Sequence, residues 1–255
     1  MNKPLVVKKL TVSYGHSSAL WDIDFAIESG QIIGVIGPNG AGKSTLIKAL
    51  LGIVKPLSGQ ALFFGKPFKK NRSRVAYVPQ KGSIDWEFPT TVFDVVLMGR
   101  YAQLGPLKWY RKSDRAKALD LLCLLQMEEL KDRQISQLSG GQQQRLFIAR
   151  ALMQEADLLF LDEPFAGVDK ATEALIMEIL AQLKKEGKTI VMVHHDLNTV
   201  EAYFDSLLIL KTSLIACGKT GDVFNADNLN RAYGEKGALF DEALSLSLSK
   251  SSGLK

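Results

Sequence analysis

The sequence has no long apolar run and no leader. No stretch approaches the roughly 18 consecutive apolar residues that a membrane-spanning helix needs, so we expect no such helix. The N-terminus lacks the basic, apolar and small-residue regions of a secretory signal, so none is expected. No internal repeat is visible.

Cysteine and histidine are scarce, with two and three residues respectively. Cys123 and Cys217 lie in apolar surroundings and lack the spacing of metal ligands. We expect them to be buried free thiols, which suit a reducing cytosol. No cluster of His, Cys and Asp resembles a metal-ligand set, so a bound transition metal is not expected in this chain.

The remaining composition is that of an ordinary globular protein. The 255 residues are 46% hydrophobic and 23% charged, enough for one large domain or two modest ones. The formal net charge of +5 is mild for a nucleic-acid-binding protein but compatible with an anionic membrane surface. The basic stretch 66–74 is interpreted as a solvated loop, with contact to nucleic acid or lipid head groups as the alternative.

One glycine-rich stretch organises the chain. Residues 37–45 fit G-x-x-x-x-G-K-[ST], the phosphate-binding loop, and lie between an apolar strand pattern and a helix pattern. Glycines let successive backbone N–H groups face a phosphate, and the helix N-terminus adds partial positive charge. Lys43 can reach the β- and γ-phosphates, and Ser44 can ligate Mg²⁺. The predicted ATP-binding residues of the loop are Gly37, Pro38, Asn39, Gly40, Ala41, Gly42, Lys43, Ser44 and Thr45.

The segment before this loop has an antiparallel character, with strand patterns at 5–12 and 20–27. Tyr14 follows the first pattern, where its ring could stack on an adenine. The residues alone favour an ordinary half-buried turn tyrosine.

Residues of about 82–155 are mostly helical in pattern and separate strands of an α/β core. An irregular loop at 82–89 carries Trp86 and Phe88. A helix at 113–127 should bury the face formed by Ala116, Leu119, Leu122, Cys123 and Gln126. We interpret this region as a helical subdomain inserted into the core.

Two further motifs carry polar groups that suit phosphate chemistry. Leu138–Gln142 opens a helix with Ser139 as a plausible N-cap and Gly140 and Gly141 behind it, an anion site or simply a capped helix start. An apolar strand pattern at 158–161 ends in Asp162 and Glu163, where α/β ligands bind. Asp162 can hold Mg²⁺, and Glu163 can orient or deprotonate a water.

A last strand pattern, 188–193, ends in His194 and His195. A single histidine is usually structural, but here two follow a strand of a nucleotide-binding sheet. We expect one of them to lie near the γ-phosphate.

Together these motifs resemble the ATP-binding cassette (ABC) ATPases over about residues 3–235. The resemblance implies an adenine platform at Tyr14, a γ-phosphate and Mg²⁺ sensor at Gln80, and a γ-phosphate switch at His195 rather than His194. It implies a dimer contact at Asp169. Its signature residues, expected to contact ATP held by a partner copy, are Ser139, Gly140, Gly141 and Gln142.

The resemblance implies an α/β fold, a P-loop NTPase core with a mixed, mainly parallel sheet. An antiparallel β subdomain and the inserted helical subdomain of about 82–155 belong to the ATPase domain 3–235, and a partly disordered tail follows at 236–255. The cofactors would be ATP and Mg²⁺, the latter held by Ser44, Gln80 and Asp162. Because one chain supplies one phosphate loop and one signature, a head-to-tail homodimer completes both sites.

A narrower resemblance, in 77–101 and 165–169, is to the ATPase subunits of bacterial manganese, zinc and iron uptake transporters. It implies a peripheral protein at the cytoplasmic face of the membrane. Its partners would be membrane permease subunits and, through them, an extracytoplasmic metal-binding protein, without nucleic acid. The alternatives are an ATPase of another importer class, or a soluble ABC ATPase acting on nucleic acid or ribosomes.

Overall fold

The structure, a computed structural model, describes residues 3–15, 17–104 and 109–234. The chain divides into unit 1, residues 1–70 and 191–255, and unit 2, residues 71–190. The predicted tail at 236–255 lies outside the described residues. Within the described ranges, no helix combines the length and the apolar character needed to cross a bilayer.

Unit 1 begins with an antiparallel sheet, in which the strands follow the order β2-β1-β4-β5. These strands are β1 (Leu5–Tyr14), β2 (Ser17–Ile27), β4 (Ser58–Phe63) and β5 (Lys66–Pro67). Alternation explains the sheet, because Ile23 and Phe25 are buried while Asp22 and Asp24 are exposed. The predicted antiparallel opening is confirmed, and β1 extends two residues further than the sequence pattern indicates.

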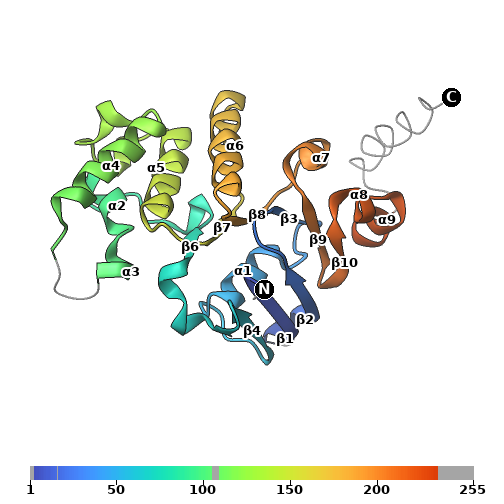
Figure 1. Ribbon diagram of the computed structural model, residues 1–255. Helices are drawn as coiled ribbons and strands as arrows, with labels where there is room; N and C mark the ends of the chain where they lie inside the picture. The colour runs from blue at the N-terminus through green and yellow to red at the C-terminus, as the bar shows by residue number, and fades with distance from the viewer. Residues whose placement is uncertain (1–2, 16, 105–108, 235–255) are drawn as a thin grey trace. The chain divides into compact units, whose positions relative to one another are not determined.

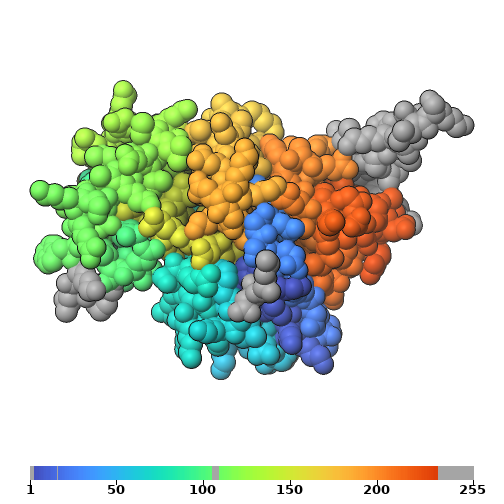
Figure 2. All heavy atoms as spheres, in the orientation of Figure 1, coloured from blue at the N-terminus to red at the C-terminus, as the bar shows by residue number. Residues whose placement is uncertain are grey.

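The phosphate loop lies against a second group of strands in unit 1. These are β3 (Ile32–Ile36), β9 (Ser206–Lys211) and β10 (Ser213–Lys219), with the helices α1 (Lys43–Leu50), α7 (Val200–Tyr203), α8 (Thr220–Val223) and α9 (Ala226–Tyr233). Strand β3 pairs in parallel with β9, which pairs antiparallel with β10. Every residue of β3 is buried, as expected for a parallel strand covered on both faces. Figure 2 shows the N-terminal strands, in blue, next to the orange and red C-terminal part of this unit, and β2 contacts β10.

Unit 2 contains two parallel strands and most of the helices (Figure 1). Its elements are β6 (Val75–Val78), α2 (Val92–Met98), α3 (Tyr101–Leu104), α4 (Lys112–Leu124), α5 (Gly140–Met153), β7 (Leu158–Asp162) and α6 (Lys170–Lys185). Helices α2, α4 and α5 pack on one another, and α5 also contacts β6. All five residues of β7 are buried, which confirms the predicted central strand. The boundaries of a helical subdomain stay a prediction.

Strand β8 (Thr189–Val193) carries the chain from unit 2 back into unit 1. Its first backbone N–H, from Thr189, donates to the carbonyl of Asp157 at 2.9 Å within unit 2. The N–H of His194 donates to the carbonyl of Val35 at 3.1 Å within unit 1. With the parallel pairs of β3 and β6, this confirms the predicted α/β class with a mainly parallel core and a separate antiparallel sheet.

Two predictions about burial were wrong. In α4 the buried side chains are Asp114, Ala118 and Leu122, spaced four residues apart, while Leu119 is exposed. The pattern misled because Asp114 is buried: it accepts hydrogen bonds from Arg100 Nε at 3.0 Å and from the backbone N–H of Arg111 at 2.8 Å.

Both cysteines are exposed rather than buried. Cys123 lies one residue beyond the buried Leu122 of α4 and therefore turns toward solvent. Cys217 lies on β10, whose residues are all at least partly exposed. Apolar neighbours in sequence did not predict burial, because neighbours along a helix or strand point in different directions.

Candidate nucleotide-binding site

The phosphate loop of unit 1 connects β3 to α1, as the motif requires. Lys43, the first residue of α1, is 6% exposed, and its Nζ donates to the carbonyl oxygens of Gly37 at 2.7 Å and of Pro38 at 3.0 Å. Ser44 and Thr45 follow in the first turn of α1. The Lys43 ammonium is thus held by the backbone of the phosphate loop, beside the N-terminus of α1, which attracts anions.

Two glycines of the loop have no substitute. Gly37 has φ 151°, and a Cβ there would lie 2.1 Å from the carbonyl oxygen of Leu210. Gly42 has φ 95° and caps α1, and its Cβ would lie 2.5 Å from the carbonyl oxygen of Ala19. Both positions combine a left-handed backbone with close approach of another strand, which only glycine allows. The loop is therefore wedged between β9 and β2, and its shape is fixed by its surroundings.

Tyr14 is the last residue of β1, at the hairpin to β2, and its side chain is 53% exposed. It is therefore not a core residue, and the alternative of a half-buried turn tyrosine stays open. An exposed ring at the end of a strand is available to stack on a flat ligand.

Replacing Tyr14 with alanine is expected to weaken ATP binding while leaving hydrolysis at saturating ATP intact. A stacking contact of about 0.5–1.5 kcal/mol corresponds to a two- to tenfold increase in the Kd for ATP. Titration calorimetry with ATP measures this change, and Tyr14→Phe, which keeps the ring, serves as the control. Equal ATP affinities for the alanine variant and the native protein would show that Tyr14 is an ordinary turn residue.

In unit 2, Asp162 ends β7 and is fully buried. The hydroxyl of Tyr77 donates to Asp162 Oδ2 at 3.5 Å. Burial, together with the nearby charge of Asp162, raises the pKa of Tyr77 above its ordinary value, so this hydroxyl keeps its proton. Tyr77 was not among the predicted site residues, although it stands three residues before Gln80 on the neighbouring strand β6.

Glu163 follows directly and has a left-handed backbone, with φ 54°. This conformation is rare for a glutamate and costs of the order of 1 kcal/mol or more. Its Oε2 accepts a hydrogen bond from Nε2 of Gln80 at 2.9 Å. Two residues predicted to act on the same phosphate, 83 positions apart in sequence, are therefore in contact.

The signature motif starts α5 as predicted. The hydroxyl of Ser139 accepts from the N–H of Gln142 at 3.4 Å, and the N–H of Ser139 donates to Oε1 of Gln142 at 2.9 Å, a reciprocal capping box. Gly140 and Gly141 form the first turn. The prediction of Ser139 as the N-cap is confirmed.

Asp169 caps α6, accepting from the backbone N–H of Thr172 at 2.8 Å. This hydrogen bond is the main reason that the pKa of Asp169 is lowered. A Cβ at Gly141 would lie 4.0 Å from Asp169 Oδ2. The N-termini of α5 and α6 thus meet at the signature, and Asp169 has a capping role in addition to the predicted dimer contact.

The two histidines of unit 1 have different environments. His194 is buried, its Nε2 lies 2.7 Å from Thr199 Oγ1, and its ring packs against Tyr203 and Phe204. His195 is exposed. The role of His195 as the switch residue stays a prediction.

Trp86 is partly exposed and packs against its own unit. Its indole N–H donates to the carbonyl of Lys81 at 3.1 Å, and its ring meets Phe147 of α5 edge-on at 5.2 Å. Phe88, in contrast, is 55% exposed. Of the two aromatics, Phe88 is the more exposed and the better candidate for contact with an external partner.

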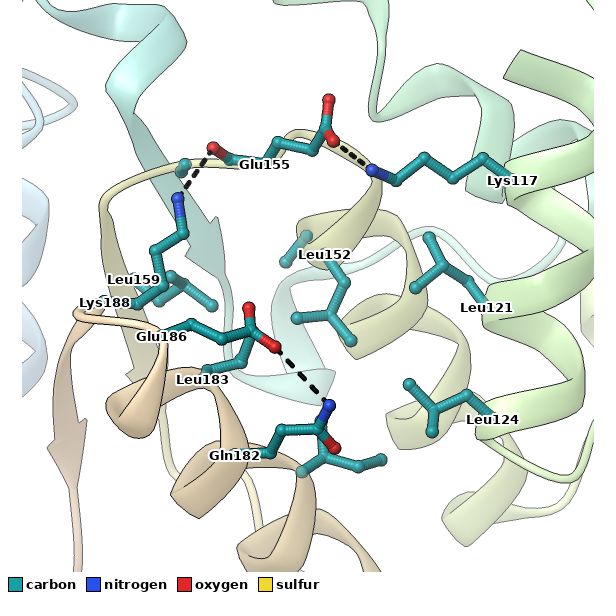
Figure 3. Close-up of a pocket in the computed structure, with 13 residues that line it drawn as sticks. Lys117, Leu121, Leu124, Leu152, Glu155, Leu159, Gln182, Leu183, Glu186 and Lys188 are labelled. Carbon is teal, nitrogen blue, oxygen red and sulfur yellow. Dashed lines mark hydrogen bonds and ion pairs between the residues drawn. The ribbon is translucent and has the colours of Figure 1, made fainter. Parts of the chain in front are cut away.

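A cavity of about 400 Å³ lies in unit 2 between α4, the C-terminal end of α5, β7 and α6 (Figure 3). Its interior is apolar, with Leu121, Leu152 and Leu159 pointing inward, and Lys117 and Glu155 form an ion pair across its rim. None of the predicted site residues lines it. The cavity is therefore separate from the nucleotide chemistry.

A phosphate loop between a buried strand and a helix, together with acids at the end of a second buried strand, defines a P-loop nucleotide-binding protein. The family profile described as ABC transporter matches residues 20–166.

Curated relatives and solved structures agree with that match. The chain is 54% identical over 231 residues to the manganese transport system ATP-binding protein MntB of Bacillus subtilis, covering 91% of this chain and 92% of that one. It is 53% identical over 228 residues to the zinc transport system ATP-binding protein TroB of Treponema pallidum, covering 89% and 86%. A solved inward-facing metal-chelate type ABC transporter is similar with a TM-score of 0.79 and 31% identity, covering 91% and 89%. The chain therefore belongs to the ABC transporter family and is an ATPase.

Proposed function

We propose that this protein is the ATP-hydrolysing subunit of a transporter that imports a transition-metal ion, manganese, zinc or iron, through separate membrane subunits. The observation that carries the proposal is the identity above 50%, over most of both chains, to ATP-binding proteins of manganese and zinc transport systems. At such identity the fold and the site chemistry are shared, and a shared transport role is the simplest consequence.

Two copies of the chain form the working unit. Each ATP lies between the phosphate loop of one copy, with Lys43 and Tyr14, and the signature of the other, with Ser139, Gly140 and Gly141. The presence of one phosphate loop and one exposed signature per chain supports this head-to-tail arrangement. Charge-assisted hydrogen bonds to the phosphates then hold the dimer closed.

Mg²⁺ accompanies the nucleotide. Magnesium prefers oxygen ligands, and Ser44, Gln80 and Asp162 offer a hydroxyl, an amide and a carboxylate oxygen. Asp162 stands at the C-terminal end of the buried strand β7, where ligands of α/β folds bind. When bound, the ion neutralises charge on the phosphate oxygens.

Glu163 orients or deprotonates the attacking water, and its strained backbone fixes the direction of the carboxylate. The amide of Gln80, 2.9 Å from that carboxylate, holds the carboxylate in place. Gln80 also connects Glu163 to the loop that follows residue 80, so movement of this loop would move the carboxylate. The exposed ring of His195 contacts the γ-phosphate. Loss of the γ-phosphate removes the contacts that join the two copies, and the dimer opens.

The membrane subunits dock on the loop after Gln80, where Phe88 offers an exposed aromatic ring. The metal ion is cargo of those subunits and of an extracytoplasmic metal-binding protein. Among the described residues, no group of three or more His, Cys, Asp or Glu is arranged to hold a metal. The protein would act as a peripheral subunit at the cytoplasmic face of the membrane.

Cells that lack this chain are expected to accumulate less of one metal when manganese, zinc and iron are limited in turn. Elemental analysis of washed cells measures the content. Wild-type protein restores it, and Lys43→Ala protein, produced to the same level, does not.

A loss of uptake of a different solute would instead identify another importer class. Unchanged contents of all three metals, with the protein recovered on nucleic acid or ribosomes, would favour a soluble ABC ATPase.

A further inference from the structure

Lys81 directly follows Gln80, the predicted γ-phosphate sensor, and its backbone is held by neighbouring residues. It begins a 3₁₀ turn, Lys81–Ser83. Its carbonyl oxygen accepts the indole N–H of Trp86, and the Trp86 ring packs on Phe147 in the middle of α5. The turn that carries Lys81 is thereby attached, through Trp86, to the signature helix.

The ammonium of Lys81 lies at the N-terminus of α5. A Cβ at Gly140, the first residue of that helix, would be only 2.9 Å from Lys81 Nζ. Two acids of the same unit have other hydrogen-bond partners: Gln80 donates to Glu163, and Thr172 donates to Asp169. In the part of the chain that the structure describes, no carboxylate forms an ion pair with Lys81.

This arrangement places a full positive charge beside the positive end of a helix dipole. The two positive charges repel each other, and an anion bound between them is attracted by both. A lysine whose only role was structural would gain more from a position at the C-terminal end of the helix.

We propose that Lys81 binds a phosphate oxygen of the ATP that this chain's signature contacts, that is, the ATP held on the phosphate loop of the partner copy. This inference rests on the composite two-copy site proposed above and adds a residue to it. Gln80 and Lys81 then serve different nucleotides: Gln80 contacts Glu163 at its own site, and Lys81 reaches the other site. The short segment that contains Gln80 and Lys81 would in this way contact both ATP molecules of the dimer.

The test uses the Glu163→Gln protein, which we expect to bind ATP without hydrolysing it. In this background, Lys81→Met should leave the Kd of the monomer for ATP unchanged, because the phosphate loop is untouched. Dimer formation with ATP should weaken about tenfold per site, and so about a hundredfold for the two-site dimer, as expected for loss of one charge-assisted hydrogen bond. Sedimentation equilibrium with saturating ATP measures the dimer constant.

Three controls separate a phosphate contact from a structural role. Lys131→Met removes an exposed lysine of the same unit and should dimerise like the background protein. Lys81→Arg keeps the charge and should restore most of the dimer. The defect of Lys81→Met should shrink as salt rises from about 0.05 to 0.5 M, because screening weakens a charge contact and leaves a packing defect unchanged.

The outcomes are distinct. A Lys81→Met dimer as stable as the background dimer refutes the role of Lys81 while leaving the composite site intact. A salt-independent defect, or one that arginine does not restore, refutes it too, because the lysine then acts through packing. If the Glu163→Gln protein itself stays monomeric with ATP, the composite site fails and the inference falls with it.

Discussion

Lys43→Ala is expected to reduce ATP hydrolysis at least about a hundredfold, the loss typical when one preorganised positive or hydrogen-bonding group is removed from a reacting centre. The Lys43 ammonium is 6% exposed and already held at the curl of the loop by the carbonyls of Gly37 and Pro38. A buried charge that needs no rearrangement to meet the phosphates contributes more than a mobile surface lysine would. Phosphate release at saturating ATP and Mg²⁺ measures the rate.

The matched control is Lys48→Ala, which removes a lysine from the last turn of the same helix α1 and should hydrolyse ATP normally. Circular dichroism and thermal unfolding confirm that the Lys43 variant is folded, since it also loses two hydrogen bonds to the loop. Hydrolysis at a near-native rate by a folded Lys43→Ala protein would contradict the assignment of the phosphate loop.

Glu163→Gln should separate ATP binding from hydrolysis and accumulate a closed dimer. The amide keeps the size of the side chain, but it loses the negative charge that polarises or deprotonates the attacking water. Asp162 and Ser44 are unchanged, so Mg²⁺ and ATP should still bind. Hydrolysis should fall about 10²- to 10⁴-fold, the usual contribution of a general base. Size-exclusion chromatography should show a dimer with ATP and a monomer with ADP or without nucleotide.

Glu178→Gln is the control, because Glu178 is an exposed carboxylate on α6 of the same unit. It should hydrolyse ATP like the native protein and show no stable dimer. Normal hydrolysis by Glu163→Gln would mean that another carboxylate is the base. A variant that binds ATP, does not hydrolyse it and remains monomeric would support the chemistry but count against the composite site.

Elements with a strong local pattern could be predicted from the sequence. The apolar runs of β3 and β7 are long enough to be recognised as buried strands, and both are buried throughout. The phosphate loop and the Ser139 cap are local motifs, in which neighbouring residues supply the whole geometry. Their positions in the structure agree with those motifs.

Contacts between distant segments could not be predicted in this way. No local pattern shows that Gln80 donates to Glu163, or that Lys81 lies over Gly140, because both contacts depend on packing of separate elements. The aromatic character of Trp86 was visible, but whether its ring faces solvent or Phe147 is decided by tertiary structure. The left-handed backbone of Glu163 was also hidden, since glutamate has no preference for it.

At Glu163 the backbone conformation lowers the stability of the fold, while the side chain is needed for ATP hydrolysis. Residues that tolerate φ near 54°, glycine above all and asparagine to a lesser degree, would relieve about 1–3 kcal/mol of strain and give a more stable protein. Such replacements would also remove the carboxylate on which hydrolysis depends. Selection for thermal stability alone would therefore favour replacement of Glu163 and, with it, loss of ATP hydrolysis. Selection for transport retains the glutamate despite its unfavourable backbone conformation.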